Sequence, residues 1–205
     1  MSSHHFVKEQ QEPAVFILST GGISLEDIGP MLEWVPTVLV AEEAAEKVLI
    51  WGIKVDVLIA SPEFQASHIH LLEEQYPLKF LTTTEGKELE EGLHYLRASD
   101  HKAAHLVGFQ HTNFESLRPC LETINLTLVD DGWKYYPVQK GGFSKWFGET
   151  SIRILGQENS PIQLKNSLGE MIFPIQYLTQ IDLPEGVSEL QSSSIFWIGE
   201  ALNQH

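Results

Sequence analysis

The chain has a single cysteine, Cys120, and no apolar run long enough to cross a membrane. One cysteine cannot form an internal disulfide, and a transmembrane helix needs about 20 consecutive apolar residues. The first residues, Met1–Glu9, also lack the apolar stretch of a secretory signal. These absences predict a cytoplasmic protein without a membrane segment.

Basic residues are scarce, and the shortage is concentrated in the first two thirds of the chain. Residues 1–131 contain 21 Asp and Glu against 8 Lys and Arg, a net charge of −13, whereas residues 132–205 contain 7 against 5, a net charge of −2. A field of this sign repels nucleic acid and anionic membranes. It also repels a free nucleotide triphosphate unless metal ions intervene. We therefore expect neither nucleic acid nor a membrane as a partner.

Short apolar runs alternate with helical patterns as far as Asp130. Each run is apolar on both faces, which is typical of strands in a buried parallel sheet. The alternation predicts an α/β domain over residues 1–131, with a Rossmann-like, doubly wound parallel sheet. The predicted strands are 14–18, 37–41, 55–60, 78–81, 103–107 and 126–129, and the predicted helices are 24–34, 42–51, 62–75, 85–98 and 113–123.

Two of these helices have marked beginnings. Ser24 stands three residues before Asp27, the arrangement of a capping box. Ser61 is followed by Pro62, which favours a serine cap with proline at the first helical position.

From residue 132 the pattern changes to short strands separated by Gly, Pro and Asn-Ser turns. Turns at intervals of about 8–12 residues predict a small antiparallel β-sandwich domain over residues 132–205. A turn at Lys140-Gly141-Gly142 predicts that the first two strands form a hairpin. The predicted strands are 133–138, 143–147, 150–155, 162–164, 171–173 and 194–198.

Acidic residues follow three of the predicted parallel strands: Glu42 and Glu43, then Glu63, then Glu85 and Glu88. The carboxyl ends of such strands converge on one crevice. Carboxylates gathered there could hold Mg²⁺, and metal-bridged phosphates could be attacked in line. The alternative is structural, because acids in the first turn of a helix interact favourably with its dipole by about 0.3–1 kcal/mol.

The order of these loops resembles the thiamine pyrophosphokinase family. Its members carry Asn-Gly, Asp-Gly-Gly-Ala, Gly-Asp-x-Asp-Ser and Asp-x-x-Asp-Leu motifs in succession. The resemblance spans roughly residues 14–200, and it extends to Gly108–Ser116 and to Thr150–Ile154. The corresponding segments here are Ser19-Thr20-Gly21-Gly22, Glu42-Glu43-Ala44-Ala45, Ser61-Pro62-Glu63 and Glu85-Gly86-Lys87-Glu88.

The resemblance implies a homodimer that transfers pyrophosphate from ATP to thiamine with Mg²⁺, giving thiamine diphosphate and AMP. It also implies roles for the residues that occupy the motif positions. They are Glu63, Glu85 and Glu88 for the metal, these three with Glu115 for catalysis, Gly21, Glu42, Glu43 and Ser61 for the nucleotide, and Ser193 and Ser194 for thiamine.

The acidic motifs depart from the family pattern. Ser61 replaces one aspartate, and each surviving acid is a glutamate, which is longer by one methylene group. Mg²⁺ requires near-octahedral geometry at about 2.0–2.1 Å, and a misplacement of about 1 Å can reduce a rate about 10²-fold. Two other hypotheses therefore stand beside the enzyme: a non-catalytic homologue that binds a small ligand or a protein partner through the same crevice, and a dimer without a ligand.

Overall fold

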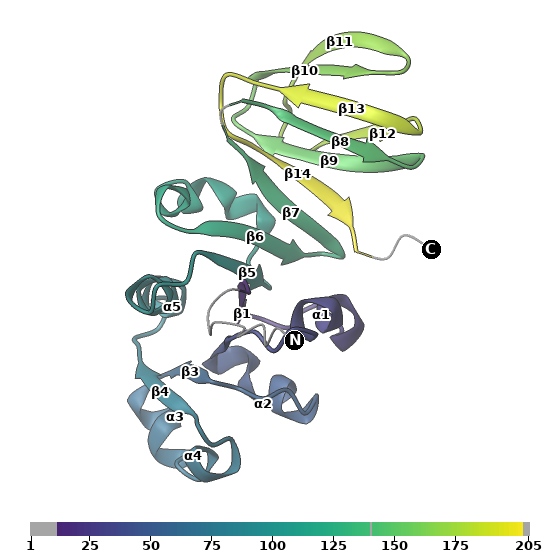
Figure 1. Ribbon diagram of the computed structural model, residues 1–205. Coiled ribbons are helices and arrows are strands. Elements are labelled where there is room, and N and C mark those ends of the chain that lie inside the picture. The colour runs from purple at the N-terminus through teal and green to yellow at the C-terminus, as the bar shows by residue number, and fades with distance from the viewer. Residues whose placement is uncertain (1–11, 140, 203–205) are drawn as a thin grey trace, which may run out of the picture. The chain divides into compact units, whose positions relative to one another are not determined.

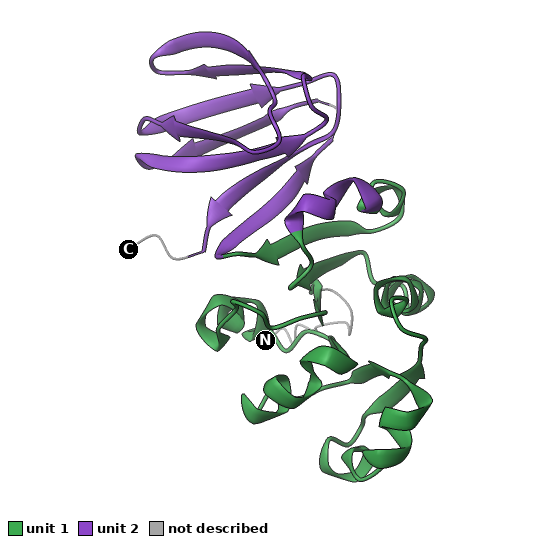
Figure 2. Cartoon of the chain, turned by 180° about the vertical axis from the view of Figure 1, so that it is seen from behind, with its two compact units in different colours: residues 1–110, 117–131 green, residues 111–116, 132–205 purple. Residues whose placement is uncertain are grey.

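The computed structural model describes residues 12–139 and 141–202. The chain divides into two compact units (Figures 1 and 2): unit 1 comprises Met1–Gln110 and Leu117–Asp131, and unit 2 comprises His111–Ser116 and Gly132–His205. Parallel strands and helices build unit 1, and antiparallel strands dominate unit 2. The prediction of an α/β protein with a parallel and an antiparallel part is confirmed at this level. No helix in the described ranges is long and apolar enough to cross a membrane.

The strands of unit 1 are all parallel to their neighbours and lie in the order β6-β5-β1-β2-β3-β4. The chain builds the sheet outward from β1 to β4 and then returns to place β5 on the other side of β1. The topology therefore reverses between β1 and β5. The strands are β1 (Ala14–Ile17), β2 (Val38–Ala41), β3 (Val57–Ala60), β4 (Lys79–Thr82), β5 (Ala103–Val107) and β6 (Asn125–Asp130).

Every residue of β1, β2 and β3 is buried. This agrees with runs that are apolar on both faces, because helices cover both sides of the sheet. In Figure 1, α5 lies on the opposite side of these strands from α1 and α2. The helices are α1 (Leu25–Leu32), α2 (Glu42–Ile50), α3 (Pro62–Ser67), α4 (Leu71–Glu74) and α5 (Glu88–Ala98), with 3₁₀ helices η1 (His111–Leu117) and η2 (Cys120–Glu122).

Both predicted helix caps are confirmed. The backbone N–H of Ser24 donates to Asp27 Oδ2 at 2.8 Å, and the N–H of Asp27 donates to Ser24 Oγ at 3.3 Å, which completes the capping box at α1. At α3 the N–H of Phe64 donates to Ser61 Oγ at 3.2 Å, and Pro62 takes the first helical position.

Two predicted helices are interrupted. The helix expected over 62–75 is divided into α3 and α4, where the hydroxyl of Ser67 donates to the carbonyls of Glu63 and Phe64 and so competes with the backbone pattern. The helix expected over 113–123 is replaced by η1 and η2. Pro119 lies between them, and a proline has no N–H to continue a helical ladder.

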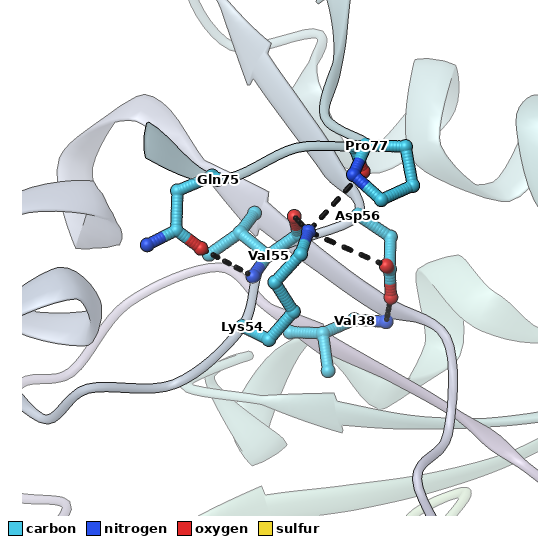
Figure 3. A network of polar contacts seen from close by, with 6 residues as sticks. All are labelled: Val38, Lys54, Val55, Asp56, Gln75 and Pro77. Atoms are coloured by element: carbon cyan, nitrogen blue, oxygen red, sulfur yellow. Dashed lines mark hydrogen bonds and ion pairs between the residues drawn. The ribbon is translucent and has the colours of Figure 1, made fainter. Parts of the chain in front are cut away.

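A polar network closes the amino-terminal edge of β2 and β3 (Figure 3). Asp56 Oδ2 accepts the N–H of Val38 at 2.9 Å, and Lys54 Nζ lies 3.8 Å from Asp56 Oδ1 and donates to the carbonyl of Pro77 at 3.2 Å. Gln75 Oε1 accepts the N–H of Val55 at 3.1 Å. Asp56 therefore satisfies backbone groups at the edge opposite to the predicted crevice.

Unit 2 contains strands in the orders β12-β9-β14-β7 and β11-β10-β13-β8. Side chains from both groups share one apolar core, including Ile154, Ile162, Leu190 and Ile198. The strands are β7 (Trp133–Val138), β8 (Phe143–Phe147), β9 (Thr150–Gly156), β10 (Pro161–Asn166), β11 (Gly169–Pro174), β12 (Thr179–Leu183), β13 (Gly186–Gln191) and β14 (Phe196–Ala201).

The predicted hairpin of residues 133–138 and 143–147 is wrong. Strand β7 pairs with β14, and β8 pairs with β13 in the other sheet. Gly141 and Gly142, with φ of 115° and 82°, lead into β8, while Lys140 lies outside the described residues. A Cβ on Gly142 would lie 2.7 Å from Gln191 Cγ, so this glycine permits the close approach of the chain to β13.

Candidate functional site

The candidate site lies in unit 1, at the carboxyl ends of β1, β2, β3 and β5. Ligands of open α/β sheets bind at this edge, where the strand order reverses. In this unit the strand order reverses between the neighbouring strands β1 and β5. The segments that follow these two strands, Ser19–Ile23 and Gly108–Gln110, therefore flank the point of reversal.

Two acids in the first turn of α2 reach the loops on either side. Glu42 Oε2 accepts the backbone N–H of Ser61, which follows β3, at 2.7 Å. Glu43 Oε1 accepts the hydroxyl of Ser19, which follows β1, at 2.9 Å. Of the predicted site residues, the structure thus joins Glu42 to Ser61 by a direct hydrogen bond, and it joins Glu43 to Ser19, which the sequence pattern did not single out.

Lys47 is a further member of the site that the sequence pattern did not single out. Its Nζ donates to the carbonyl oxygens of Thr20 at 3.1 Å and Ile23 at 3.3 Å, and it lies 5.1 Å from the ring centroid of Trp51. The available signal was its spacing, because a residue four positions after Glu43 shares a helix face with it.

Backbone contacts hold the loop after β1 against β5. The N–H groups of Leu18 and Ser19 donate to the carbonyl of Val107 at 2.8 and 3.4 Å. The N–H of exposed Gly21 donates to Ser19 Oγ at 3.3 Å. Gly108 has φ of 75°, and a Cβ there would lie 2.0 Å from the Ser19 carbonyl oxygen. The two segments therefore meet backbone to backbone.

The other predicted acids of unit 1 take no part in the hydrogen bonds that Glu42, Glu43 and Lys47 make. Glu63 is exposed in the first turn of α3, and Glu85 is exposed in the turn after β4. Glu88 begins α5, where its Oε1 accepts the N–H of Gly86 at 3.3 Å. Beside it, the hydrogen bond from Lys87 to Glu90, at 2.8 Å, lowers the pKa of Glu90 and raises the pKa of Lys87.

These acids do not fit a bound metal ion as they are placed. Within residues 12–139 and 141–202, no group of three or more His, Cys, Asp or Glu side chains could hold one. Mg²⁺ needs several oxygen ligands at about 2.0–2.1 Å. Glu42 and Glu43 instead direct carboxylate oxygens at protein donors, and Glu63, Glu85 and Glu88 do not form a ligand set.

The remaining predicted residues belong to unit 2. Glu115 is exposed on η1. Ser193 borders a surface depression of about 350 Å³. The N–H of Ser194 donates to Ser192 Oγ at 3.3 Å, and the Ser192 hydroxyl donates to the carbonyl of Pro161 at 2.9 Å. The depression is lined by Pro161, Gln163, Ile172, Gln191, Ser192 and Ser193.

Comparison with protein-family models gives no match to this sequence, and neither does comparison with the curated proteins. Solved structures do match. Thiamin pyrophosphokinase from Geobacillus thermodenitrificans is 13% identical with a TM-score of 0.67, covering 92% of this chain and 97% of its own.

The enzyme from Bacillus subtilis is 12% identical with a TM-score of 0.68, covering 93% of this chain and 100% of its own. Thiamin pyrophosphokinase from Candida albicans is 10% identical with a TM-score of 0.60, and the match covers 96% of this chain and 91% of that enzyme. Since both parts of the chain are covered, the resemblance inferred from the sequence is confirmed at the level of the fold: this chain has the fold of the thiamin pyrophosphokinases.

Proposed function

We propose that this chain is a non-catalytic protein with the thiamin pyrophosphokinase fold, which binds a small uncharged or cationic molecule in unit 1, at the carboxyl ends of the parallel strands. Thiamine or a related compound is the first candidate, because solved structures with a similar fold are thiamin pyrophosphokinases. The proposal includes the finer description of the parts: a doubly wound, Rossmann-like domain over residues 1–131 and a β-sandwich domain over residues 132–205.

The observation that carries this proposal is that the two acids in the first turn of α2 already accept hydrogen bonds from the protein itself. Glu42 and Glu43 accept hydrogen bonds from Ser61 and Ser19, so they connect loops of the protein. A metal ion at these carboxylates would have to compete with both donors. Glu63, Glu85 and Glu88 do not assemble into a replacement site.

Charge supports the same conclusion. Residues 1–131 have a net charge of −13, and like charges raise the free energy of an approaching polyphosphate. Without a well-held divalent cation, ATP is repelled from this unit. An organic cation is attracted by the same field. The expected ligand is therefore one that needs no metal for binding.

The second candidate is Mg²⁺-dependent transfer of pyrophosphate from ATP to thiamine, which the fold favours. The test is to incubate the protein with ATP, thiamine and either Mg²⁺ or Mn²⁺ and to measure AMP. We expect no more AMP than the Glu85→Gln, Glu88→Gln double variant releases. Release by the wild type well above that control would overturn the non-catalytic proposal.

Ligand binding is tested separately by thermal unfolding with thiamine, thiamine diphosphate, AMP or ATP, each with and without Mg²⁺. A bound ligand raises Tm with concentration, by mass action. We expect thiamine to raise Tm without metal and ATP to leave it unchanged. Stabilisation by ATP only when Mg²⁺ is present would favour the enzyme. If none of the four compounds changes Tm, the proposed binding of thiamine or a related compound is wrong.

A homodimer and a cytoplasmic location, both expected from the sequence, are further parts of the proposal. Light scattering coupled to size-exclusion chromatography tests the first. Microscopy of the fluorescently tagged full chain tests the second.

A further inference from the structure

The loop from Ser19 to Ile23 is held by one helix at two separate points. At its beginning, the Ser19 hydroxyl donates to Glu43 at 2.9 Å. Further along, Lys47 donates to the carbonyls of Thr20 and Ile23, which belong to buried residues. Both side chains come from α2, one helical turn apart, so one face of this helix contacts the loop near its beginning and at its end.

The two contacts have opposite chemistry, and each is suited to its partner. A carboxylate can only accept hydrogen bonds, so Glu43 selects the donor on Ser19. An ammonium group can only donate, so Lys47 selects carbonyl oxygens. Because Glu43 and Lys47 are both exposed residues, they add little to the apolar core. Their hydrogen bonds therefore define the loop more than they stabilise the fold.

The loop between these points contains Gly21 and Gly22, both exposed, and Gly22 has φ of 70°. Glycines give a loop many alternative conformations. Without external contacts, such a loop next to the β1/β5 reversal would sample many of them. The contacts from α2 select one.

We propose that Glu43 and Lys47 are positioning residues, which hold the Ser19–Ile23 loop in the conformation that receives the ligand at the edge of unit 1. The part concerning the ligand rests on the proposed function. The part concerning the loop does not, because it is a property of the protein without ligand. The two parts are therefore tested by different measurements.

The loop is tested by amide hydrogen exchange of the full chain without ligand. In Lys47→Met we expect the amides of Gly21 and Ile23 to exchange about tenfold faster, since a charge-assisted contact is lost and the loop opens locally. Lys47→Arg should restore slow exchange, because a guanidinium can also donate to both carbonyls. Lys102→Met, an exposed lysine elsewhere in unit 1, is the matched control. Unchanged exchange in Lys47→Met would overturn the inference.

Binding is tested with thiamine as the probe. We expect Lys47→Met and Glu43→Gln to weaken thiamine binding about tenfold, with only a small change in Tm of the free protein, whereas Glu46→Gln on the same helix leaves binding unchanged. Equal affinity in all variants would overturn the link between loop and ligand. If the wild type does not bind thiamine, the proposed function fails for this ligand, and the exchange experiment alone decides the role of Glu43 and Lys47.

Discussion

A Cβ atom on Gly108 would lie 2.0 Å from the carbonyl oxygen of Ser19. This relationship fixes how closely the segments after β5 and β1 approach each other at the candidate site. Gly108 also has φ of 75°, which disfavours any residue with a side chain. We expect Gly108→Ala to lower the free energy of unfolding by more than about 3 kcal/mol, because backbone must move to remove the overlap. Urea denaturation measures this change.

Gly52 provides the matched control for that substitution. Its φ is 71°, and its Cβ would have no neighbour within 4 Å. Gly52→Ala should therefore carry only the conformational cost, about 1 kcal/mol. Equal effects at the two positions would show that the contact with Ser19 is unimportant.

The packing of α5 on the sheet depends on Gly92. A Cβ there would lie 2.2 Å from Phe16 Cε1 and 2.9 Å from Ile59 Cδ1. Alanine favours a helix by about 1 kcal/mol over glycine, but overpacking costs about 1–3 kcal/mol or more. We expect Gly92→Ala to be destabilising by about 1–2 kcal/mol, and we expect Phe16→Leu to reduce that loss in the double variant. Additive effects in urea denaturation would contradict a direct overlap.

His101 gives unit 1 a pH-dependent stability. The residue is 4% exposed, with Nδ1 3.0 Å from Ser99 Oγ and Nε2 3.1 Å from Thr37 Oγ1. Burial lowers the pKa of His101 below its usual value near 6.5. Below pH 6.5 the unfolded chain binds a proton that the folded protein excludes, so stability falls until the lower folded pKa is passed. Above that range His101 has no such effect.

The measurement is the free energy of unfolding between pH 5 and pH 8, compared with His101→Asn. The wild type should lose stability more steeply on acidification, by at most about 1.4 kcal/mol for each pH unit. Parallel curves for the two proteins would rule out this contribution.

Lys145 and Glu200 connect the two sheets of unit 2. Nζ lies 2.6 Å from both carboxylate oxygens, and the residues belong to β8 and β14. The side chains are 44% and 24% exposed, so solvent screens the pair. A double-mutant cycle with Lys145→Met and Glu200→Gln should give a coupling energy of about 0.5–1 kcal/mol that decreases with added salt. A coupling of zero at low salt would contradict the link.

The hydrogen bond from Tyr136 to the same carboxylate adds an alkaline dependence. Burial, with a smaller effect of that bond, raises the pKa of Tyr136 above its usual value of 10. Above pH 10 the tyrosine of the unfolded chain loses its proton while the folded protein retains it. The stability that is present below pH 10 is therefore lost as the pH rises further. We expect the unfolding free energy of the wild type to fall more steeply above pH 10 than that of Tyr136→Phe. Identical slopes would contradict this role.

Much of the fold could be predicted from local patterns. The strand at Ala103–Val107 has the predicted bounds, and β1, β2 and β3 begin or end within two residues of the predicted ones. These strands are buried on both faces, so their apolar runs are continuous and easily recognised. The caps at Ser24 and Ser61 were equally clear, because a cap depends only on residues within one helical turn.

Partners distant in sequence could not be predicted in the same way. The turn residues after β7 suggested a hairpin, but β7 and β8 pair in different sheets. Strands β12 and β13 were not predicted, because their apolar residues are few and mixed with polar ones. Strand pairing is decided by which faces can be buried together, and this is a property of the whole unit.

The candidate site likewise has features that local sequence patterns predict and features that depend on contacts between distant segments. The sequence by itself determined that acids follow the parallel strands, since this needs only the order of strands and loops along the chain. Only the tertiary structure decided what the acids contact: Glu42 meets Ser61, Glu43 meets Ser19, and Lys47 reaches two carbonyls of the loop after β1. A hydrogen bond requires distances near 3 Å, and segments more than 15 residues apart reach such distances only when the sheet has formed.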